Sequence, residues 1–101
     1  MALSCFTLAA PALAWFYDGN RLLDLCEREG RGEATWSGGV CYGFIMGAYD
    51  AQARSSCIPS GVKTAQIFDI AKMFLRDHPE KRQMPAAGLV SAAIKEKFPC
   101  N

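Results

Sequence analysis

The cysteine content most constrains what this chain can fold into. The sequence has 101 residues and five cysteines. Four of these, Cys26, Cys41, Cys57 and Cys100, follow an apolar opening segment that contains the fifth. A domain of this size builds only a small core, and small exported domains are commonly stabilised by disulfides. The even number of cysteines therefore predicts a small fold held by two disulfide bonds.

The spacing of the four cysteines disfavours metal and redox chemistry. None of them stands in a C-x-x-C pair or in the C-x₂₋₄-C arm of a zinc site. Four cysteines allow more than one pairing, and local geometry only ranks the choices. We favour a bond from Cys26 to Cys41, which would join two successive helices across a glycine-rich turn. The bond from Cys57 to Cys100 would then tie a central loop to the C-terminus.

The opening segment, residues 1–14, has the features of a signal peptide. It contains no charged residue and ends in Ala12-Leu13-Ala14. This composition is typical of a secretory apolar region followed by an A-x-A cleavage site, although the basic start is missing, as it would be in a truncated sequence. The alternative is a buried N-terminal helix of the mature domain, which Pro11 disfavours. We therefore expect residues 15–101 to form an exported mature domain.

Charge and hydropathy narrow the choice of partner. Lys and Arg together number 11, Asp and Glu number 10, and 50% of the residues are hydrophobic. Surfaces that bind nucleic acid or anionic membranes need clustered surplus positive charge, which this sequence lacks. No segment approaches the length needed to span a bilayer. We therefore expect no nucleic-acid partner and no membrane insertion.

The apolar pattern predicts an all-α fold. Apolar residues recur at spacings of three and four, which indicates a small bundle of about four to five helices. The first helix is expected from an Asn20 cap to Gly30 and the second over 40–54, capped by Thr35 or Ser37. A third is expected from a Thr64 cap to Pro79, and a fourth with Pro85 in its first turn. The side chains expected to face inward are Leu22, Leu23, Cys26, Ile67, Ile70, Ala71, Phe74, Ala87, Val90, Ala93, Ile94 and Phe98.

Small residues recur at every fourth position of the predicted second helix, at Gly39, Gly43, Gly47 and Ala51. Glycine costs about 1 kcal/mol relative to alanine inside a helix, so this repeat needs a packing reason. We predict that it lets another backbone approach closely, either inside the domain or between the subunits of a dimer. Aromatic residues around it fit either a core or a binding surface, and they are Trp36, Tyr42, Phe44 and Tyr49.

The sequence offers little for catalysis. His78 is the single histidine, and imidazole is the usual base for a Ser or Cys nucleophile. Its position before Pro79, at a predicted helix end, favours an interaction with terminal carbonyls instead. Asp50 is an isolated carboxylate without the second group that acid-base chemistry needs. We expect no catalytic residue, no metal site and no cofactor.

Several motifs in order resemble one family of bacterial proteins. The motifs are Gly19-Asn20-Arg-Leu-Leu-Asp-Leu-Cys26, Cys41-Tyr-Gly-Phe-Ile-Met-Gly-Ala-Tyr-Asp50, Cys57-Ile-Pro-Ser-Gly-Val62 with Gln66, Phe74-Leu-Arg-Asp-His78-Pro79-Glu80, and Phe98-Pro99-Cys100. Together they cover nearly the whole predicted mature chain. In this order, and with four cysteines, they are similar to the Rap/Tai family of periplasmic immunity proteins. That family protects bacteria against peptidoglycan amidase effectors of the type VI secretion system. One departure is Ser60, where an acidic residue is common.

The resemblance implies a small, disulfide-containing, often homodimeric periplasmic protein that binds an amidase effector and blocks its active site. Such an inhibitor needs no catalytic residue. The residues we expect to contact the effector lie in two loops and are Arg54, Ser55, His78, Glu80, Lys81, Arg82 and Gln83. The alternative is that these residues form only a solvated turn.

Other functions remain open on the sequence alone. A general periplasmic stress or chaperone-like protein, or a subunit of an envelope assembly, would need no amidase target. A small hydrolase would depend on His78 or on a free cysteine thiol, which the even cysteine count disfavours.

Overall fold

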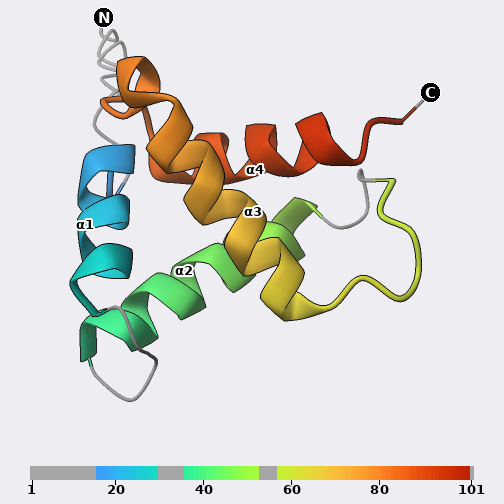
Figure 1. Cartoon of the computed structure of the whole chain (residues 1–101), viewed down its shortest axis with the longest axis horizontal. Coiled ribbons are helices and arrows are strands. Elements are labelled where there is room, and N and C mark those ends of the chain that lie inside the picture. Colours follow the sequence, from blue (N-terminus) through green and yellow to red (C-terminus); the bar gives the residue numbers. More distant parts are fainter. Residues whose placement is uncertain (1–15, 30–35, 53–56, 101) are drawn as a thin grey trace, which may run out of the picture.

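The computed structural model describes residues 16–29, 36–52 and 57–100. Within these residues the chain forms α1 (Gly19–Glu29), α2 (Trp36–Gln52), α3 (Thr64–Asp77), the 3-10 helix η4 (Pro79–Lys81) and α4 (Ala86–Lys97), and no strand (Figure 1). The predicted all-α fold is therefore confirmed. The predicted signal segment 1–14, the proposed cap Thr35, and the loop residues Arg54 and Ser55 all lie outside the described residues.

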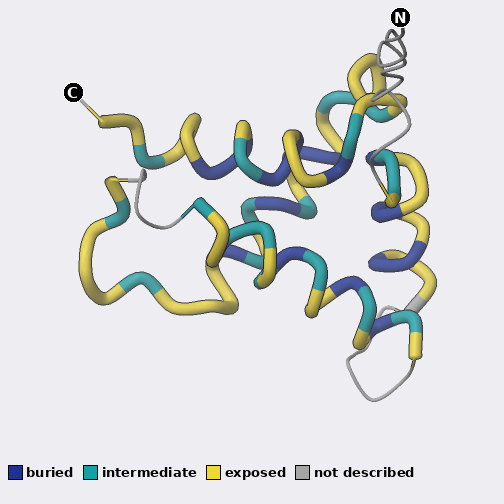
Figure 2. Tube along the Cα trace, turned by 180° about the vertical axis from the view of Figure 1, so that it is seen from behind, coloured by how far each residue is buried: buried dark blue, intermediate teal, exposed yellow. Residues whose placement is uncertain are grey.

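The four α-helices pack as two pairs around one core. α1 packs mainly on α2 and α3 mainly on α4, while α2 also contacts both α3 and α4. In Figure 1, α3 crosses α2 and α4 lies along the side of the molecule away from the α1–α2 corner. The buried parts of each helix face inward in Figure 2. The largest fully buried side chains are Leu22, Leu25, Ile45, Ile67, Leu75, Val90, Ile94 and Cys41.

Most of the predicted core is buried, with one clear error on α4. Ala87 was expected to face inward and is exposed. α4 begins at Ala86, so the buried face follows Ala86, Leu89 and Val90, then Ala93 and Ile94. This is the spacing of three and four residues expected for one helical face, and Ala87 lies outside it. Ile70 and Phe98 are only partly buried against the core.

The start of α1 is fixed by Asp18. The Asp18 carboxylate accepts a hydrogen bond from the backbone N–H of Arg21 at 2.8 Å, as an N-cap does. The predicted Asn20 cap is therefore wrong. Instead, the N–H of Asn20 donates to the carbonyl of Arg82 at 2.9 Å. A tertiary contact thus uses the residue that local propensity suggested as the cap.

Gly19 lets the chain approach this closely. Its N–H donates to the carbonyl of Met84 at 3.0 Å. A Cβ at this position would lie 2.6 Å from Leu89 Cδ1 and 3.0 Å from the Arg82 carbonyl oxygen. Any larger residue would push α1 away from the segment that leads into α4. Asp18 and Pro85 also form an isolated β-bridge here.

The glycine strip on α2 faces away from the rest of the domain. A Cβ added at Gly39, Gly43 or Gly47 would meet none of the described residues within 4 Å, and all three residues are exposed. Close packing of this strip inside the domain, one of two predicted alternatives, is therefore wrong. α2 also begins earlier than expected, at Trp36, so Ser37 lies within the helix rather than capping it.

The aromatic residues of α2 divide between surface and core. Trp36 is 71% exposed. The Tyr42 side chain is 36% exposed, and its ring centroid lies 5.6 Å from that of Phe68. Phe44 and Tyr49 are partly buried against the core.

Both predicted disulfides are present. Cys26–Cys41 joins α1 to α2 with a Cα–Cα distance of 5.0 Å, and both cysteines are buried. Cys57–Cys100 joins the segment before α3 to the segment after α4 with a Cα–Cα distance of 5.2 Å, and both cysteines are exposed.

The boundaries of α3 and α4 differ from prediction by a residue or so. The cap of α3 is Lys63, whose N–H donates to the side-chain oxygen of Gln66 at 2.8 Å, so the predicted Thr64 cap is wrong. α3 ends at Asp77, as Pro79 predicted. Pro85 is the N-cap of α4 and stands just before its first turn.

None of the described helices is long and apolar enough to cross a membrane.

Candidate binding surface around residues 78–83

The segment 78–83 connects α3 to α4 and is held at both ends. At its start, His78 Nδ1 donates to the carbonyl of Phe74 at 3.0 Å, and the two rings stack with centroids 4.1 Å apart. In its middle, the N–H of Lys81 donates to the carbonyl of His78 at 3.0 Å. At its end, the carbonyl of Arg82 accepts the bond from α1 described above. Because both ends are fixed, the segment presents its exposed side chains in a defined position.

The predicted contact residues of this segment occupy two environments. Glu80, Lys81 and Gln83 are exposed, whereas His78 and Arg82 are half-buried. The Lys81 amine lies 5.8 Å from the centroid of the Phe74 ring, within the range of a cation–π contact. The Nε atom of Arg82 is buried and has no hydrogen-bond partner among the described residues.

Arg54 and Ser55, the other predicted contact residues, lie outside the described residues. α2, the helix that precedes them, ends at Gln52, and its end lies far from the connection between α3 and α4 in Figure 1. Within the described residues, the structure therefore brings together only the members of the segment 78–83.

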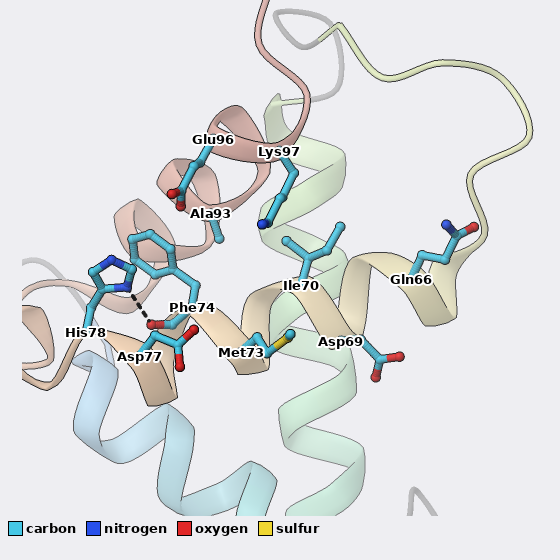
Figure 3. Close-up of a pocket in the computed structure, with 10 residues that line it drawn as sticks. All are labelled: Gln66, Asp69, Ile70, Met73, Phe74, Asp77, His78, Ala93, Glu96 and Lys97. Atoms are coloured by element: carbon cyan, nitrogen blue, oxygen red, sulfur yellow. Dashed lines mark hydrogen bonds between the residues drawn. The ribbon is translucent and has the colours of Figure 1, made fainter.

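Three hollows on the described surface meet at this segment. The first, of about 310 Å³, lies between α3 and α4 and has His78 in its wall (Figure 3). The second, of about 460 Å³, is lined by α1 and α3 and includes Arg82. The third, of about 230 Å³, lies beside Lys81 over the start of α4. Side chains of the segment therefore face concave surfaces on several sides.

The hollow between α1 and α3 contains paired charges. Arg76 Nε lies 2.6 Å from a carboxylate oxygen of Glu27. Asp24 pairs with Arg28 at 2.5 Å and with Arg21 at 3.8 Å. All of these side chains are about half exposed, and such pairs contribute only about 0–1 kcal/mol each.

The groove between α3 and α4 was not predicted from the sequence. Its floor is apolar and its edges carry Asp69, Asp77 and Glu96. Asp69, Met73 and Asp77 recur at every fourth position of α3, which places them on one helical face. That repeat was the available signal. The inward-facing residues predicted on this helix are Ile67, Ile70, Ala71 and Phe74, and Met73, whose side chain is 50% exposed, stands outside them.

The geometry is suited to binding a partner. All four cysteines within the described residues are in disulfides, and the His78 ring lies against Phe74. No group of three or more His, Cys, Asp or Glu side chains that could hold a metal occurs among the described residues. What the surface offers is a fixed charged segment bordered by hollows of mixed polarity.

Comparison with known proteins identifies the family. Residues 18–100 match the family model of the Rap1a immunity proteins. The chain belongs to the Rap1a immunity protein family. The match spans every described helix of the Rap1a domain and both disulfides, and it agrees with the resemblance found in the sequence motifs. A search of curated proteins finds no match.

Proposed function

We propose that this Rap1a-family protein is a periplasmic immunity protein that binds a peptidoglycan amidase effector of the type VI secretion system and occludes its active site. Membership of the family supports the immunity class. The observation that carries the mechanism is the segment 78–83, which is charged, exposed and held at both ends. A binding segment that is already ordered loses little conformational entropy in the complex.

The exposed side chains of Glu80, Lys81 and Gln83 form the central contact in this proposal. His78 and Arg82 are half-buried and act mainly by positioning the segment. Arg54 and Ser55 contribute a second contact region, at the other loop predicted from the sequence. No catalytic residue of the immunity protein takes part.

Export is part of the same proposal. Residues 1–14 are a signal peptide that is removed in the periplasm, and residues 15–101 are the mature domain. Two disulfides support an oxidising compartment, because disulfides are rare in the reducing cytosol. Mass spectrometry of protein recovered from the periplasm should give an N-terminus at Trp15.

The deciding experiment mixes the oxidised protein with peptidoglycan amidase effectors of the same organism and follows complex formation and cell-wall hydrolysis. We expect a stoichiometric complex and loss of hydrolysis. Glu80→Lys should weaken binding about tenfold or more, since a like charge then faces the effector's complementary group. Asp50→Lys makes the same charge change at an exposed position of α2 and is the matched control. Binding to many unfolded proteins, but to no amidase, would overturn the proposal in favour of a chaperone-like function.

A homodimer is also part of the proposal, and the exposed strip of Gly39, Gly43 and Gly47 supports it. Packing among the described residues does not need glycine at these positions, since an added Cβ would meet no atom of that part of the chain within 4 Å. Close approach of a second α2 supplies the missing packing reason. Analytical ultracentrifugation should show a dimer for the wild-type protein and a monomer for Gly43→Leu. Equal sedimentation of the two proteins would contradict this dimer.

A further inference from the structure

The groove between α3 and α4 combines an apolar floor with charged edges. Ile70, Met73 and Phe74 of α3 and Ala93 of α4 supply its apolar surface. In Figure 3 the side chains of Asp69 and Asp77 project from α3, and those of Glu96 and Lys97 project from α4. The volume of about 310 Å³ is at the lower end of the range for ligand pockets, which is about 300–1,000 Å³. It therefore accommodates a few side chains rather than a large ligand.

The carboxylates of this groove stand apart from the ion pairs seen in the part of the chain that the structure describes. Asp69, Asp77 and Glu96 form no ion pair with any described residue, and neither does Lys97. In the hollow between α1 and α3, by contrast, both Asp24 and Glu27 are paired with arginine. The lining of the groove has three carboxylates and one lysine, so it carries an excess of acidic side chains. Its charge is therefore complementary to a basic group from outside the chain.

The floor is suited to an apolar side chain beside that basic group. Met73 is half exposed, and methionine is flexible and polarisable, so it adapts to the shape of a bound side chain. Phe74 adds a ring that is itself fixed by stacking on His78. The groove thus pairs an adaptable apolar contact with a fixed one.

We propose that this groove binds a segment of the effector that carries a lysine or arginine next to an apolar side chain. The apolar side chain lies on Met73 and Phe74, and the cation lies among the carboxylates at the edges. This inference rests on the proposed function for the source of the segment. It adds a further contact, at the groove beside the segment 78–83, and states the chemistry of its ligand.

Substitutions of opposite sign test the charge. Asp69→Asn combined with Glu96→Gln should weaken binding of the effector about tenfold and slow association, since the basic group loses two attracting charges. Lys97→Gln should strengthen binding several-fold, because it removes the one lysine that competes with the ligand. Asp50→Lys changes the net charge by the same two units at an exposed position of α2 and should leave affinity within about twofold. All of these side chains are exposed, so circular dichroism should show unchanged folding.

The outcomes separate the groove from the function. Equal affinity of the groove pair and Asp50→Lys, or weaker binding by Lys97→Gln, would refute the groove while leaving the proposed function intact. Absence of any complex with the wild-type protein would refute the proposed function and the effector segment together. A change in sedimentation of the groove variants without a change in effector affinity would assign the groove to self-association and overturn the inference.

Discussion

The two disulfides make the same bond in opposite surroundings. Cys26–Cys41 lies inside the core, where the two cysteines are 5% and 1% exposed, and it joins two helices that pack on each other. Cys57–Cys100 lies on the surface and joins two segments outside the helices. The first is a core contact as well as a covalent link. The second only limits where two irregular segments can go.

Loop length alone predicts that the exposed bond Cys57–Cys100 stabilises the fold more than the buried bond Cys26–Cys41. The chain-entropy relation gives about 3 kcal/mol for a loop of about 15 residues and about 4 kcal/mol for one of about 43, the separations of these pairs. That relation counts freedom gained by the unfolded chain. Breaking Cys57–Cys100 also frees the native segments 57–63 and 98–100, which offsets part of the loss. We therefore expect the buried bond to stabilise the fold more.

The largest expected effect comes from removing the buried bond. Cys26→Ala combined with Cys41→Ala should lower the free energy of unfolding by about 3–5 kcal/mol, because it removes both the cross-link and buried sulfur atoms. Urea denaturation followed by circular dichroism measures this change. A decrease in the free energy of unfolding of less than about 1 kcal/mol would contradict the large stabilisation that we assign to the buried bond.

A smaller effect is expected from the exposed bond. Cys57→Ser combined with Cys100→Ser should cost about 1–2 kcal/mol, less than the chain-entropy value, because the native segments also gain freedom. Mild reduction of the wild-type protein, followed by alkylation and mass spectrometry, should modify Cys57 and Cys100 before the buried pair. Simultaneous modification of all four cysteines would contradict a difference in access.

The smallest effect on stability is expected from Gly43→Leu. Gly43 lies on the exposed face of α2, close in sequence to the buried Cys41. The substitution therefore tests whether the exposed face of α2 contributes to the stability of the domain. The free energy of unfolding of the monomer should rise by up to about 1 kcal/mol, the difference in helix propensity between glycine and leucine. Urea denaturation at low protein concentration measures it, and a clear loss of stability would show that α2 is constrained on both faces.

Much of the fold could be predicted because the signals are local. The three-and-four spacing of apolar residues gave the helices and most of the core, and both cysteine pairs were ranked correctly. Pro79 gave the end of α3. These features depend on residues close in sequence or on simple geometry, so one chain suffices to infer them.

The remaining features depend on tertiary contacts. Asn20 is a good cap by type, but α1 already begins at Gly19, so Asn20 lies in the first turn and Asp18 is the cap. The glycine repeat showed that one face of α2 is smooth without showing whether anything covers it. The groove was not predicted because it forms between α3 and α4. The sequence of α3 alone does not indicate that α4 lies beside its Asp69–Met73–Asp77 face.

The contact of Gly19 and Asn20 with residues 82–85 bears on how the protein can be handled. It places the first described residues of the chain beside the segment 78–83, whereas the C-terminus lies far from that segment in Figure 1. An affinity tag or fluorophore attached just before residue 16 would crowd the segment 78–83, which is proposed to meet the effector. A label or surface tether at the C-terminal end would leave the segment 78–83 open, but it would lie next to Cys57, which is close in sequence to the second proposed contact region.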